Sequence, residues 1–260
     1  MIELNTLNYT VDSGIAKLVL NQPKSLNAIN SAMLDDLNTF IDAIEADESV
    51  RVVILTGEGK AFMAGGDIKE MMKMDQQVAK KFIEYGNYTM NRLANLKQIM
   101  IGALNGFALG GGLELALTCD LRIGCAENTI GFPEVGLGIM PGYGGTQRAV
   151  RLIGLGATKR LVFTGELIDG KEAYRLGLID YLAPKEDLLK EADKLAEKLM
   201  QQAPLALEKA KLAINRGSQS TLQEGLLLEN EIVTGLFNSQ DRVEGMSAFV
   251  EKRKANFEGK

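Results

Sequence analysis

A glycine-rich run that ends in a glutamate is the clearest candidate for chemistry in this sequence. Gly110, Gly111 and Gly112 precede Leu113 and Glu114. If a helix begins near Gly111, its first N–H groups have no partner within the helix, and without side chains in the way they can approach a ligand carbonyl oxygen. Glu114 then lies one turn later on the same face, next to that carbonyl. The alternative is that Glu114 is a first-turn carboxylate favoured by the helix dipole.

A second carboxylate, Glu134, stands in the otherwise apolar stretch 131–138. Desolvating a lone carboxylate is costly, so an acid in such surroundings is usually paired or functional. Two further glycine-containing segments, 64–69 and 141–148, are weak signals by themselves, because glycine turns often serve only to permit a positive φ or close packing. Neither nucleotide-binding signature fits, since the sequence has no Gly-Lys-Ser/Thr ending and no Gly-x-Gly-x-x-Gly after a first strand.

The composition removes whole classes of enzyme. The 260 residues include no histidine, which excludes a Ser-His-Asp triad, a Cys-His pair and any histidine-containing zinc or iron site. Acid and base chemistry must then come from carboxylates, Lys, Tyr or Cys. Cys119 and Cys125 are the only cysteines, and their apolar setting indicates reduced core residues of a cytosolic protein. We therefore expect neither a metal nor a redox cofactor.

The charge balance and the N-terminus bear on location and partners. A net charge of -5 and a pI near 5.1, without a long Lys/Arg run, argue against a nucleic-acid or anionic-membrane surface. The N-terminus has no basic segment followed by an apolar one, and no stretch reaches the roughly 18 uninterrupted apolar residues of a membrane span. We expect a cytoplasmic protein with no membrane and no nucleic-acid partner.

The elements that must position the glutamates follow an α/β pattern. Short runs rich in Val, Ile and Leu alternate with longer segments of helical period. We expect strands at 15–20, 50–56, 99–104 and 121–124, the last two flanking the glycine-rich run. Between the first two we expect a helix with Ser31 as its N-cap. Its apolar residues recur every three or four positions: Leu34, Leu37, Ile41 and Ile44.

The sequence changes in character near residue 190, after which charged, Ala- and Leu-rich helical segments contain no strand-like run. We divide the chain into residues 1–190, an α/β core with the site, and residues 191–260, a helical region. The second part carries a set of apolar residues on one face: Leu222, Leu226, Leu227, Ile232, Leu236 and Phe237. A small helical tail does not easily bury such a face against itself, so a partner subunit is one way to cover it.

Seven segments, in order along nearly the whole chain, closely resemble the crotonase (enoyl-CoA hydratase) family. They are residues 26–28, 61–71, 105–116, 119–120, 132–138, 141–148 and 248–254. The resemblance implies a crotonase-like (ClpP/crotonase) α/β fold of repeated β-β-α units with a C-terminal helical trimerisation region. It also implies self-association as a homotrimer or as a dimer of trimers, a homohexamer.

The resemblance further implies a set of site residues. The oxyanion hole falls on the backbone N–H groups of Gly66 and Gly111, and the two carboxylates of family members that hydrate enoyl thioesters fall on Glu114 and Glu134. The implied substrate and coenzyme A contacts are Lys24, Leu26, Ala64, Gly66, Asp67, Ile68, Lys69, Gly111, Phe249 and Lys252. The last two belong to the tail, which reaches a neighbouring subunit's ligand in this interpretation.

The implied activity is a hydro-lyase reaction, the reversible syn addition of water to a trans-2-enoyl-CoA to give a 3-hydroxyacyl-CoA in fatty-acid and short-chain acyl-CoA metabolism, including β-oxidation. Coenzyme A is part of the substrate, and no separate cofactor is expected. An enoyl-CoA isomerase or another acyl-CoA enzyme on the same scaffold is the main alternative, because fold does not fix function. RNA binding, found in some relatives, is disfavoured by the acidic pI.

Three positions depart from the family pattern without removing a catalytic group. Gly66 stands where Ala is common, which leaves the N–H available in a more flexible loop. Phe132 stands where Gln is frequent and so removes a polar neighbour of Glu134. Ile99 stands where Pro is frequent.

Overall fold

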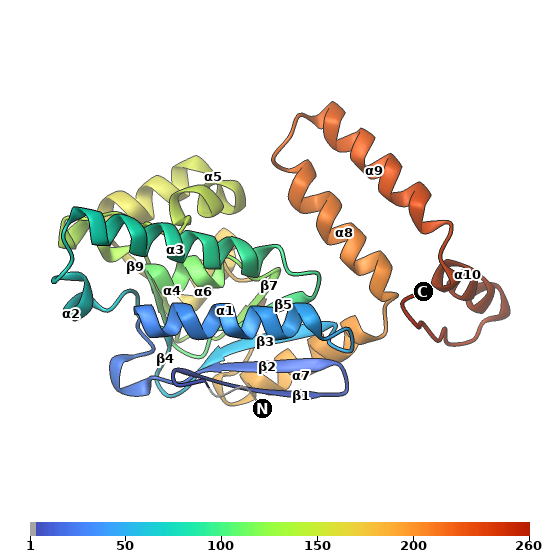
Figure 1. The fold of residues 1–260 in the computed structure, drawn as a ribbon, viewed down its shortest axis with the longest axis horizontal. Helices are drawn as coiled ribbons and strands as arrows, with labels where there is room; N and C mark the ends of the chain where they lie inside the picture. The colour runs from blue at the N-terminus through green and yellow to red at the C-terminus, as the bar shows by residue number, and fades with distance from the viewer. Residues whose placement is uncertain (1–3) are drawn as a thin grey trace.

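The first of two sheets carries the long strands at the centre of the molecule. In the computed structural model, which describes residues 4–260, it has six strands in the order β1-β2-β3-β5-β7-β10. Their bounds are β1 (Leu7–Asp12), β2 (Ile15–Leu20), β3 (Val52–Gly57), β5 (Ile99–Ala103), β7 (Leu121–Gly124) and β10 (Tyr181–Leu182) (Figure 1). β1 is antiparallel to β2, and the other neighbouring pairs are parallel. The four expected strands are confirmed as β2, β3, β5 and β7, with ends shifted by at most about two residues.

Short strands form the second sheet, in the order β4-β6-β8-β9. Their bounds are β4 (Ala61–Met63), β6 (Phe107–Leu109), β8 (Thr129–Gly131) and β9 (Leu167–Asp169). The first three are parallel and β9 is antiparallel to β8. The pairs β3/β4, β5/β6 and β7/β8 each divide between the two sheets and lead into helical segments, which confirms the expected β-β-α repeats. Because β4, β6 and β8 are parallel, the segments that follow them meet at one edge of the second sheet.

The helices of the core begin with α1 (Ser31–Ala46) and α3 (Gln76–Ala94), which lie side by side in Figure 1. The N-cap of α1 is Asn30, whose side chain accepts a hydrogen bond from the N–H of Met33 at 2.9 Å. The prediction of Ser31 as cap is therefore wrong by one residue, because Asn30 has the extended backbone and an equally good capping oxygen. The remaining core segments are α2 (Ile68–Met71), α4 (Gly111–Ala116), α5 (Gly145–Thr164), α6 (Gly170–Leu176), η1 (Pro23–Ser25), η2 (Pro133–Leu137) and η3 (Lys185–Asp187).

Both faces of the six-stranded sheet are covered, which explains the unbroken apolar run of β3. Val53 and Leu55 belong to a large buried cluster that includes the inner face of α1, whereas Val52 and Ile54 pack on the other face with α7 (Leu188–Met200). Alternate residues of a strand point to opposite faces, so a doubly covered strand is apolar throughout. The boundary expected at residue 190 falls inside α7, whose buried face belongs to the core.

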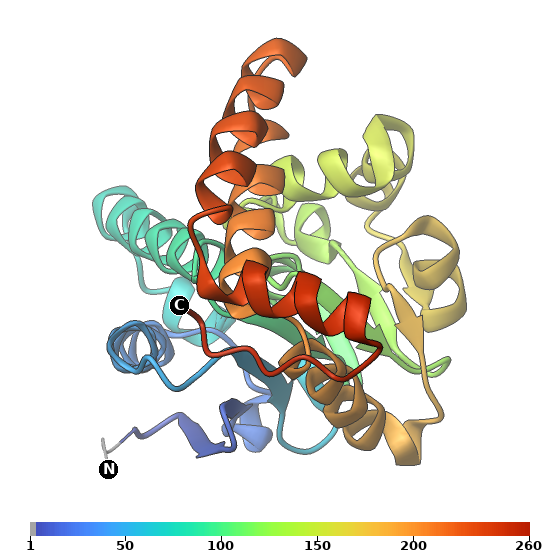
Figure 2. The ribbon, with the colours of Figure 1, turned by 90° about the vertical axis from the view of Figure 1, so that its right-hand side faces the viewer.

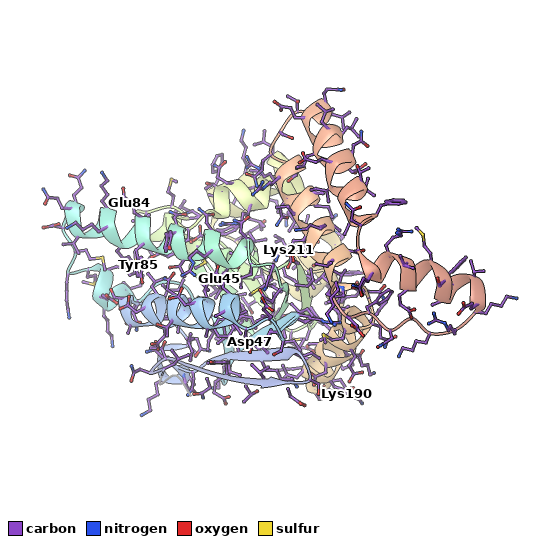
Figure 3. All side chains as sticks on the ribbon, turned by 45° about the vertical axis from the view of Figure 1, so that its right-hand side comes forward. Glu45, Asp47, Glu84, Tyr85, Lys190 and Lys211 are labelled. Atoms are coloured by element: carbon purple, nitrogen blue, oxygen red, sulfur yellow. The ribbon has the colours of Figure 1, made fainter. Side chains whose placement is uncertain are left out.

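The last three helices project from the core. They are α8 (Pro204–Gly217), α9 (Leu222–Leu236) and α10 (Gln240–Glu251), and Figures 1 and 2 show α8 and α9 as a pair standing away from the sheets with α10 crossing near their base. Lys211 attaches α8 to the core, because its Nζ contacts Asp120 at 2.7 Å and the carbonyl oxygen of Gln98 at 2.8 Å (Figure 3). α9 has no buried residue, and Leu222, the first of its apolar residues, is 79% exposed.

Two sequence features of the core can be checked directly. Cys119 and Cys125 are free and buried, and burial raises the pKa of the Cys119 thiol to about 12. Such a thiol is protonated and unreactive at neutral pH, as a structural role requires. Within residues 4–260, none of the helices combines the length and apolar character needed to cross a membrane.

Candidate active site

A cavity of about 750 Å³ opens at the edge of the second sheet where β4, β6 and β8 end. The loop after β4, the N-terminus of α4 after β6, and η2 after β8 each contribute to its wall, and the first half of α3 and the loop 137–143 close its apolar side. The cavity brings together Gly66, Gly111, Glu114 and Glu134, which are far apart in the sequence. The parallel register of the short strands therefore assembles all four predicted catalytic positions.

Glu114 is held by backbone donors. α4 begins at Gly111 as predicted, and Glu114 is only 1% exposed. Its Oε1 accepts hydrogen bonds from the N–H groups of Tyr143 and Gly145, each at 2.7 Å. Burial raises the pKa of Glu114, and these N–H groups together with the charge of Arg148 oppose that effect. Oε2 has no hydrogen-bond partner among residues 4–260, so one oxygen is fixed while the other is available in the cavity.

Glu134 is buried without comparable support. It lies in η2 and is 9% exposed, and its Oε2 is buried with no hydrogen-bond partner among the described residues. Burial, reinforced by the nearby charge of Glu114, raises the pKa of Glu134 to about 7. Near neutral pH this carboxyl group is therefore present in both protonation states, which suits a group that donates and accepts protons.

Gly110 is needed for the two carboxyl groups to share the cavity. Its φ of 51° lies where a side chain is strained, and a Cβ at this position would stand 2.6 Å from Oε1 of Glu134. Gly110 is therefore the N-cap of α4, and its lack of a side chain leaves the space that the carboxyl group of Glu134 occupies. The sequence indicated a glycine requirement here but not its contact with Glu134.

The two expected oxyanion-hole donors are free for a ligand. The N–H of Ile29 donates to Gly65 and the N–H of Asp67 donates to Ile29, so the polar groups of the intervening Gly66 face the other way. Gly111 is the first residue of α4, where an N–H has no acceptor within the helix. Both glycines line the cavity, and neither N–H has an acceptor in the part of the chain that the structure describes.

The departures at Gly66 and Phe132 have clear local consequences. A Cβ on Gly66 would lie 2.8 Å from Sδ of Met71, the mobile end of a side chain that can shift. Phe132 is fully buried, and its ring would lie 2.7 Å from a Cβ on Gly145. Phe132 thus supports the turn that donates to Glu114, and within residues 4–260 no side chain supplies a hydrogen bond to Oε2 of Glu134 in place of the Gln that is frequent in the family.

Four of the predicted coenzyme A contacts line the cavity directly: Ala64, Gly66, Ile68 and Gly111. Leu26 adjoins them, because its carbonyl oxygen accepts the N–H of Ala64 at 3.0 Å. Lys24 is exposed on the neighbouring η1. These residues form one continuous edge beside the oxyanion-hole donors.

The remaining predicted contacts divide into two groups. Asp67 caps α2 through the N–H groups of its first turn, at 2.9 and 3.2 Å, and Lys69 is exposed on the same helix. Phe249 and Lys252 lie on and after α10, at the opposite end of the molecule from α2 in Figure 1. The structure therefore does not bring the tail residues to the cavity of their own chain.

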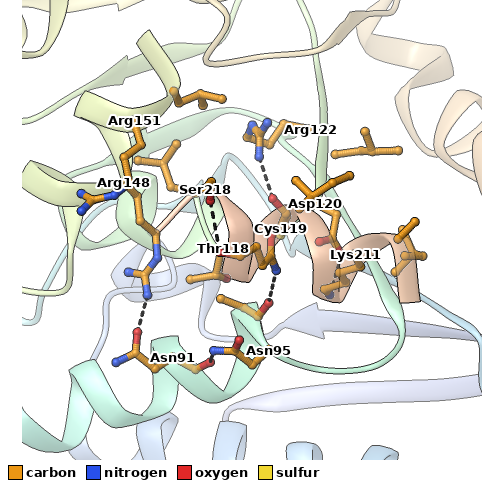
Figure 4. A pocket seen from close by; sticks show the side chains of 18 of the residues that line it. Asn91, Asn95, Thr118, Cys119, Asp120, Arg122, Arg148, Arg151, Lys211 and Ser218 are labelled. Carbon is orange, nitrogen blue, oxygen red and sulfur yellow. Dashed lines mark hydrogen bonds and ion pairs between the residues drawn. The ribbon is translucent and has the colours of Figure 1, made fainter. Parts of the chain in front are cut away.

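A second cavity of about 620 Å³ lies between α5, α8, the end of α3 and the segment after α4 (Figure 4). Two of its four cations, Arg122 and Lys211, are paired with carboxylates, and the other two, Arg148 and Arg151, donate hydrogen bonds to neutral oxygens of the core. Arg122 binds Asp180 at 2.8 Å, Lys211 binds Asp120 at 2.7 Å, and Arg148 donates to Asn91. The pairing indicates a structural junction between the core and the arm of α8 and α9.

Two free N–H groups and two buried carboxyl groups around one apolar cavity define an enzyme that stabilises negative charge on an oxygen while protons move beside it. A family model described as Enoyl-CoA hydratase/isomerase matches residues 10–260, so the chain belongs to this family.

Named relatives and a solved structure agree with this membership. The chain is 44% identical over 254 residues to a short-chain-enoyl-CoA hydratase of Clostridium acetobutylicum, covering 97% of each chain. It is 41% identical over 244 residues to a crotonyl-CoA hydratase of Syntrophomonas wolfei, covering 94% of each. The crystal structure of an enoyl-CoA hydratase from Bacillus anthracis superimposes with a TM-score of 0.96 at 38% identity, covering 98% of this chain and 100% of that one.

Proposed function

We propose that this protein is an enoyl-CoA hydratase that adds water reversibly to a trans-2-enoyl-CoA and forms a 3-hydroxyacyl-CoA. The observation that carries the proposal is the pair of buried glutamates, Glu114 and Glu134, in one cavity with two unpaired backbone N–H groups. The names of the relatives that match over nearly the whole chain support the same activity.

The N–H groups of Gly66 and Gly111 would bind the thioester oxygen. When water adds at Cβ, negative charge moves through the conjugated system onto that oxygen. Two fixed N–H donors stabilise the charge where it develops, and each such donor typically lowers the barrier by about 3 to 4 kcal/mol. The oxyanion hole therefore removes the main obstacle, which is the enolate-like charge.

The glutamates would divide the proton transfers. Glu114, whose anion receives two N–H hydrogen bonds, takes a proton from the water as its oxygen attacks Cβ. Glu134, whose pKa is raised to about 7, delivers its proton to Cα. Both groups line the same cavity, which suits addition of the hydroxyl and the proton to one face of the double bond. A proton passed from Glu114 to Glu134 through the next water restores the starting state.

The coenzyme A part of the substrate would follow the edge formed by Lys24, Leu26 and residues 64–69. Phe249 and Lys252 are too far from this edge within one chain, so we propose that they serve a neighbouring copy in a homotrimer or a dimer of trimers. The exposed apolar residues of α9 support such an assembly. The free, buried cysteines are consistent with a cytoplasmic enzyme.

The activity test is a product analysis with crotonyl-CoA. A hydratase consumes the enoyl absorbance and yields 3-hydroxybutyryl-CoA, whereas an isomerase moves the double bond and a hydrolase releases free coenzyme A. Formation of 3-hydroxybutyryl-CoA as the main product is expected. Isomerisation of a 3-enoyl-CoA without hydration would show that the protein uses one carboxylate and the N–H pair to catalyse a different reaction, the isomerisation.

The coenzyme A path has its own test in two lysines. Lys69→Ala and Lys252→Ala should chiefly raise KM with little change in kcat, because an exposed ammonium that binds the nucleotide phosphates acts on ground and transition states alike. Lys171→Ala, a charge change on α6 outside the cavity wall, is the control. An unchanged KM in both variants would show that the path is misplaced.

A further inference from the structure

One of the two peptide units that support Glu114 is held at both ends by side chains. The N–H of Tyr143 donates to Oε1 of Glu114 at 2.7 Å, and the carbonyl oxygen of Gly142 accepts Nδ2 of Asn87 at 2.6 Å. These two groups belong to the same peptide unit, and in a trans peptide the C=O and N–H point in opposite directions. Fixing the oxygen on the outside therefore directs the N–H toward the carboxylate.

The other supporting unit needs no such side chain. The N–H of Gly145 donates to Glu114, and the carbonyl oxygen of Gly144 accepts the N–H groups of Gln147 and Arg148 at 3.0 and 2.8 Å. The first turn of α5 thus fixes this peptide through its own hydrogen bonds. The two donors to Glu114 differ in that one depends on helix formation and the other on Asn87.

The identity of the Asn87 contact is set by its surroundings. Nδ2 of Asn87 meets two carbonyl oxygens, those of Ile83 at 3.2 Å and Gly142 at 2.6 Å, and only the NH₂ end of the amide can donate to both. One turn further along α3, Oδ1 of Asn91 accepts from Arg148, which also donates to the carbonyl oxygen of Tyr143 at 2.8 Å. α3 therefore anchors two successive peptide units of the turn.

We propose that Asn87 is a positioning residue for Glu114, because its amide holds the Gly142–Tyr143 peptide with the Tyr143 N–H toward the carboxylate. Gly142 has no Cβ to restrict rotation of this peptide, so the restraint must come from outside the turn. Without the Asn87 amide, the unit can turn its N–H away and leave Glu114 with one donor. The inference rests on the proposed role of Glu114 as the group that activates water.

Glu114 faces three groups whose charge or ionisation affects its proton affinity: Glu134 on η2, Arg148 on α5 and the Tyr143 hydroxyl on the intervening loop. Asn87→Ala alters none of these groups and adds no charge, whereas Asn87→Asp adds a negative charge that acts on Glu114 in the same direction as the lost hydrogen bond. A hydrogen bond to a carboxylate favours its charged form, so losing one raises its pKa. The pH at which kcat falls on the acid side of its pH profile, here called the acid limb, therefore shows whether the Tyr143 N–H still donates to Glu114.

The test compares Asn87→Ala and Asn87→Asp with Asn95→Ala. Asp keeps the shape of Asn but places an acceptor against the Gly142 oxygen. Asn95, the C-cap of α3, is the matched control, because within residues 4–260 its side-chain amide hydrogen-bonds only to the carbonyl oxygen of Asn91, at 2.8 Å. Both Asn87 variants should lose about 10- to 100-fold in kcat for crotonyl-CoA hydration, the usual effect of one hydrogen bond to a charged group. Their KM should change little and their acid limb should move to higher pH, and the Asn95 variant should match the parent.

A second comparison separates this inference from the proposed function. In a Glu114→Gln background, adding Asn87→Ala should cost less than twofold, because the group it positions is gone. If Glu114→Gln itself keeps full activity, the proposed function of Glu114 fails. If Glu114→Gln is inactive while Asn87→Asp, folded by circular dichroism, keeps the parental kcat and acid limb, the positioning role of Asn87 is wrong. A kcat loss without movement of the limb also overturns it.

Discussion

The turn that supports Glu114 and the short helix that carries Glu134 surround two glutamates differently, although burial raises the pKa of both. Two N–H groups converge on Glu114 at 2.7 Å, but Glu134 has a buried oxygen with no partner and a pKa raised to about 7. Support for the anion suits a base, and its absence suits an acid that holds its proton near neutral pH. In the proposed mechanism, local backbone donors rather than residue type therefore assign the two roles.

Removing either carboxylate should have the largest effect. Glu114→Gln and Glu134→Gln keep the size and hydrogen-bonding capacity of the side chain but cannot exchange a proton, and acid/base catalysis typically contributes 10²- to 10⁴-fold. Each variant should lose about that much kcat for hydration while still binding a coenzyme A thioester. If the two act on one water, the double variant loses far less than the product of the single losses.

The same kinetic measurements can also contradict the proposed roles of the two glutamates. Near-normal hydration by Glu134→Gln, together with an inactive Glu114→Gln, would make Glu134 a structural acid and move the assignment toward an isomerase with a single carboxylate. Measuring hydration and isomerisation in the same preparations distinguishes these outcomes.

A methyl group at Gly110 should disturb Glu134 more than Glu114. Gly110→Ala adds strain at a φ of 51° and places a Cβ 2.6 Å from Oε1 of Glu134, so the carboxyl group must move. We expect a loss of roughly 10- to 100-fold in kcat, in line with the displacement of one proton donor. Gly136→Ala, also in η2, is the matched control and should retain parental activity, because a Cβ added there would have no heavy atom within 4 Å. Equal kcat values for the two variants would contradict this account.

The burial of Glu134 should be measurable as a stability cost. Because its folded pKa of about 7 exceeds the ordinary value of 4.5, the native state binds more protons than the unfolded state between these pH values, and wild-type stability falls as pH rises through that window. Glu134→Gln removes this dependence. Above pH 7 the variant should be more stable by about 3 kcal/mol, seen as a Tm higher by several degrees, and near pH 4 the difference should vanish.

The control for this smaller effect is Glu48→Gln, an exposed carboxylate outside the cavity. It should leave the Tm unchanged at both pH values. A Glu134→Gln variant that is no more stable than the parent at pH 8 would show that the carboxyl group is better solvated than the geometry indicates.

The sequence predicted those elements of the fold that are long enough to show a recognisable pattern of apolar residues. The buried strands β2, β3, β5 and β7 read as Val/Ile/Leu runs, and the glycines before Glu114 marked the start of α4. The second sheet left no periodicity because each of its strands has three residues, and the resemblance to a family supplied it as β-β-α repeats. α7 joined the core through Leu188, Ala192 and Ala196, and the last two are small residues that give little indication of burial.

The site was predictable in its side chains but not in its backbone. Glu134 drew attention as an acid among apolar residues, and Glu114 through its place after the glycines. The donors from Tyr143 and Gly145 carry no residue-type signal, since any residue has an N–H, and only the tertiary turn aims them. Asn87 was missed for a similar reason, because a single polar residue in a helical segment is usually a solvated one.

The central claim, that the buried Glu134 holds its proton up to neutral pH, is tested most directly by the titration of its own carboxyl group. Infrared difference spectra of the parent against Glu134→Gln, recorded across pH, isolate the protonated carboxyl band of this residue. The account predicts a band that persists at pH 6 and titrates with a midpoint of about 7. A midpoint near the ordinary value of 4.5 would contradict the division of roles between the two glutamates.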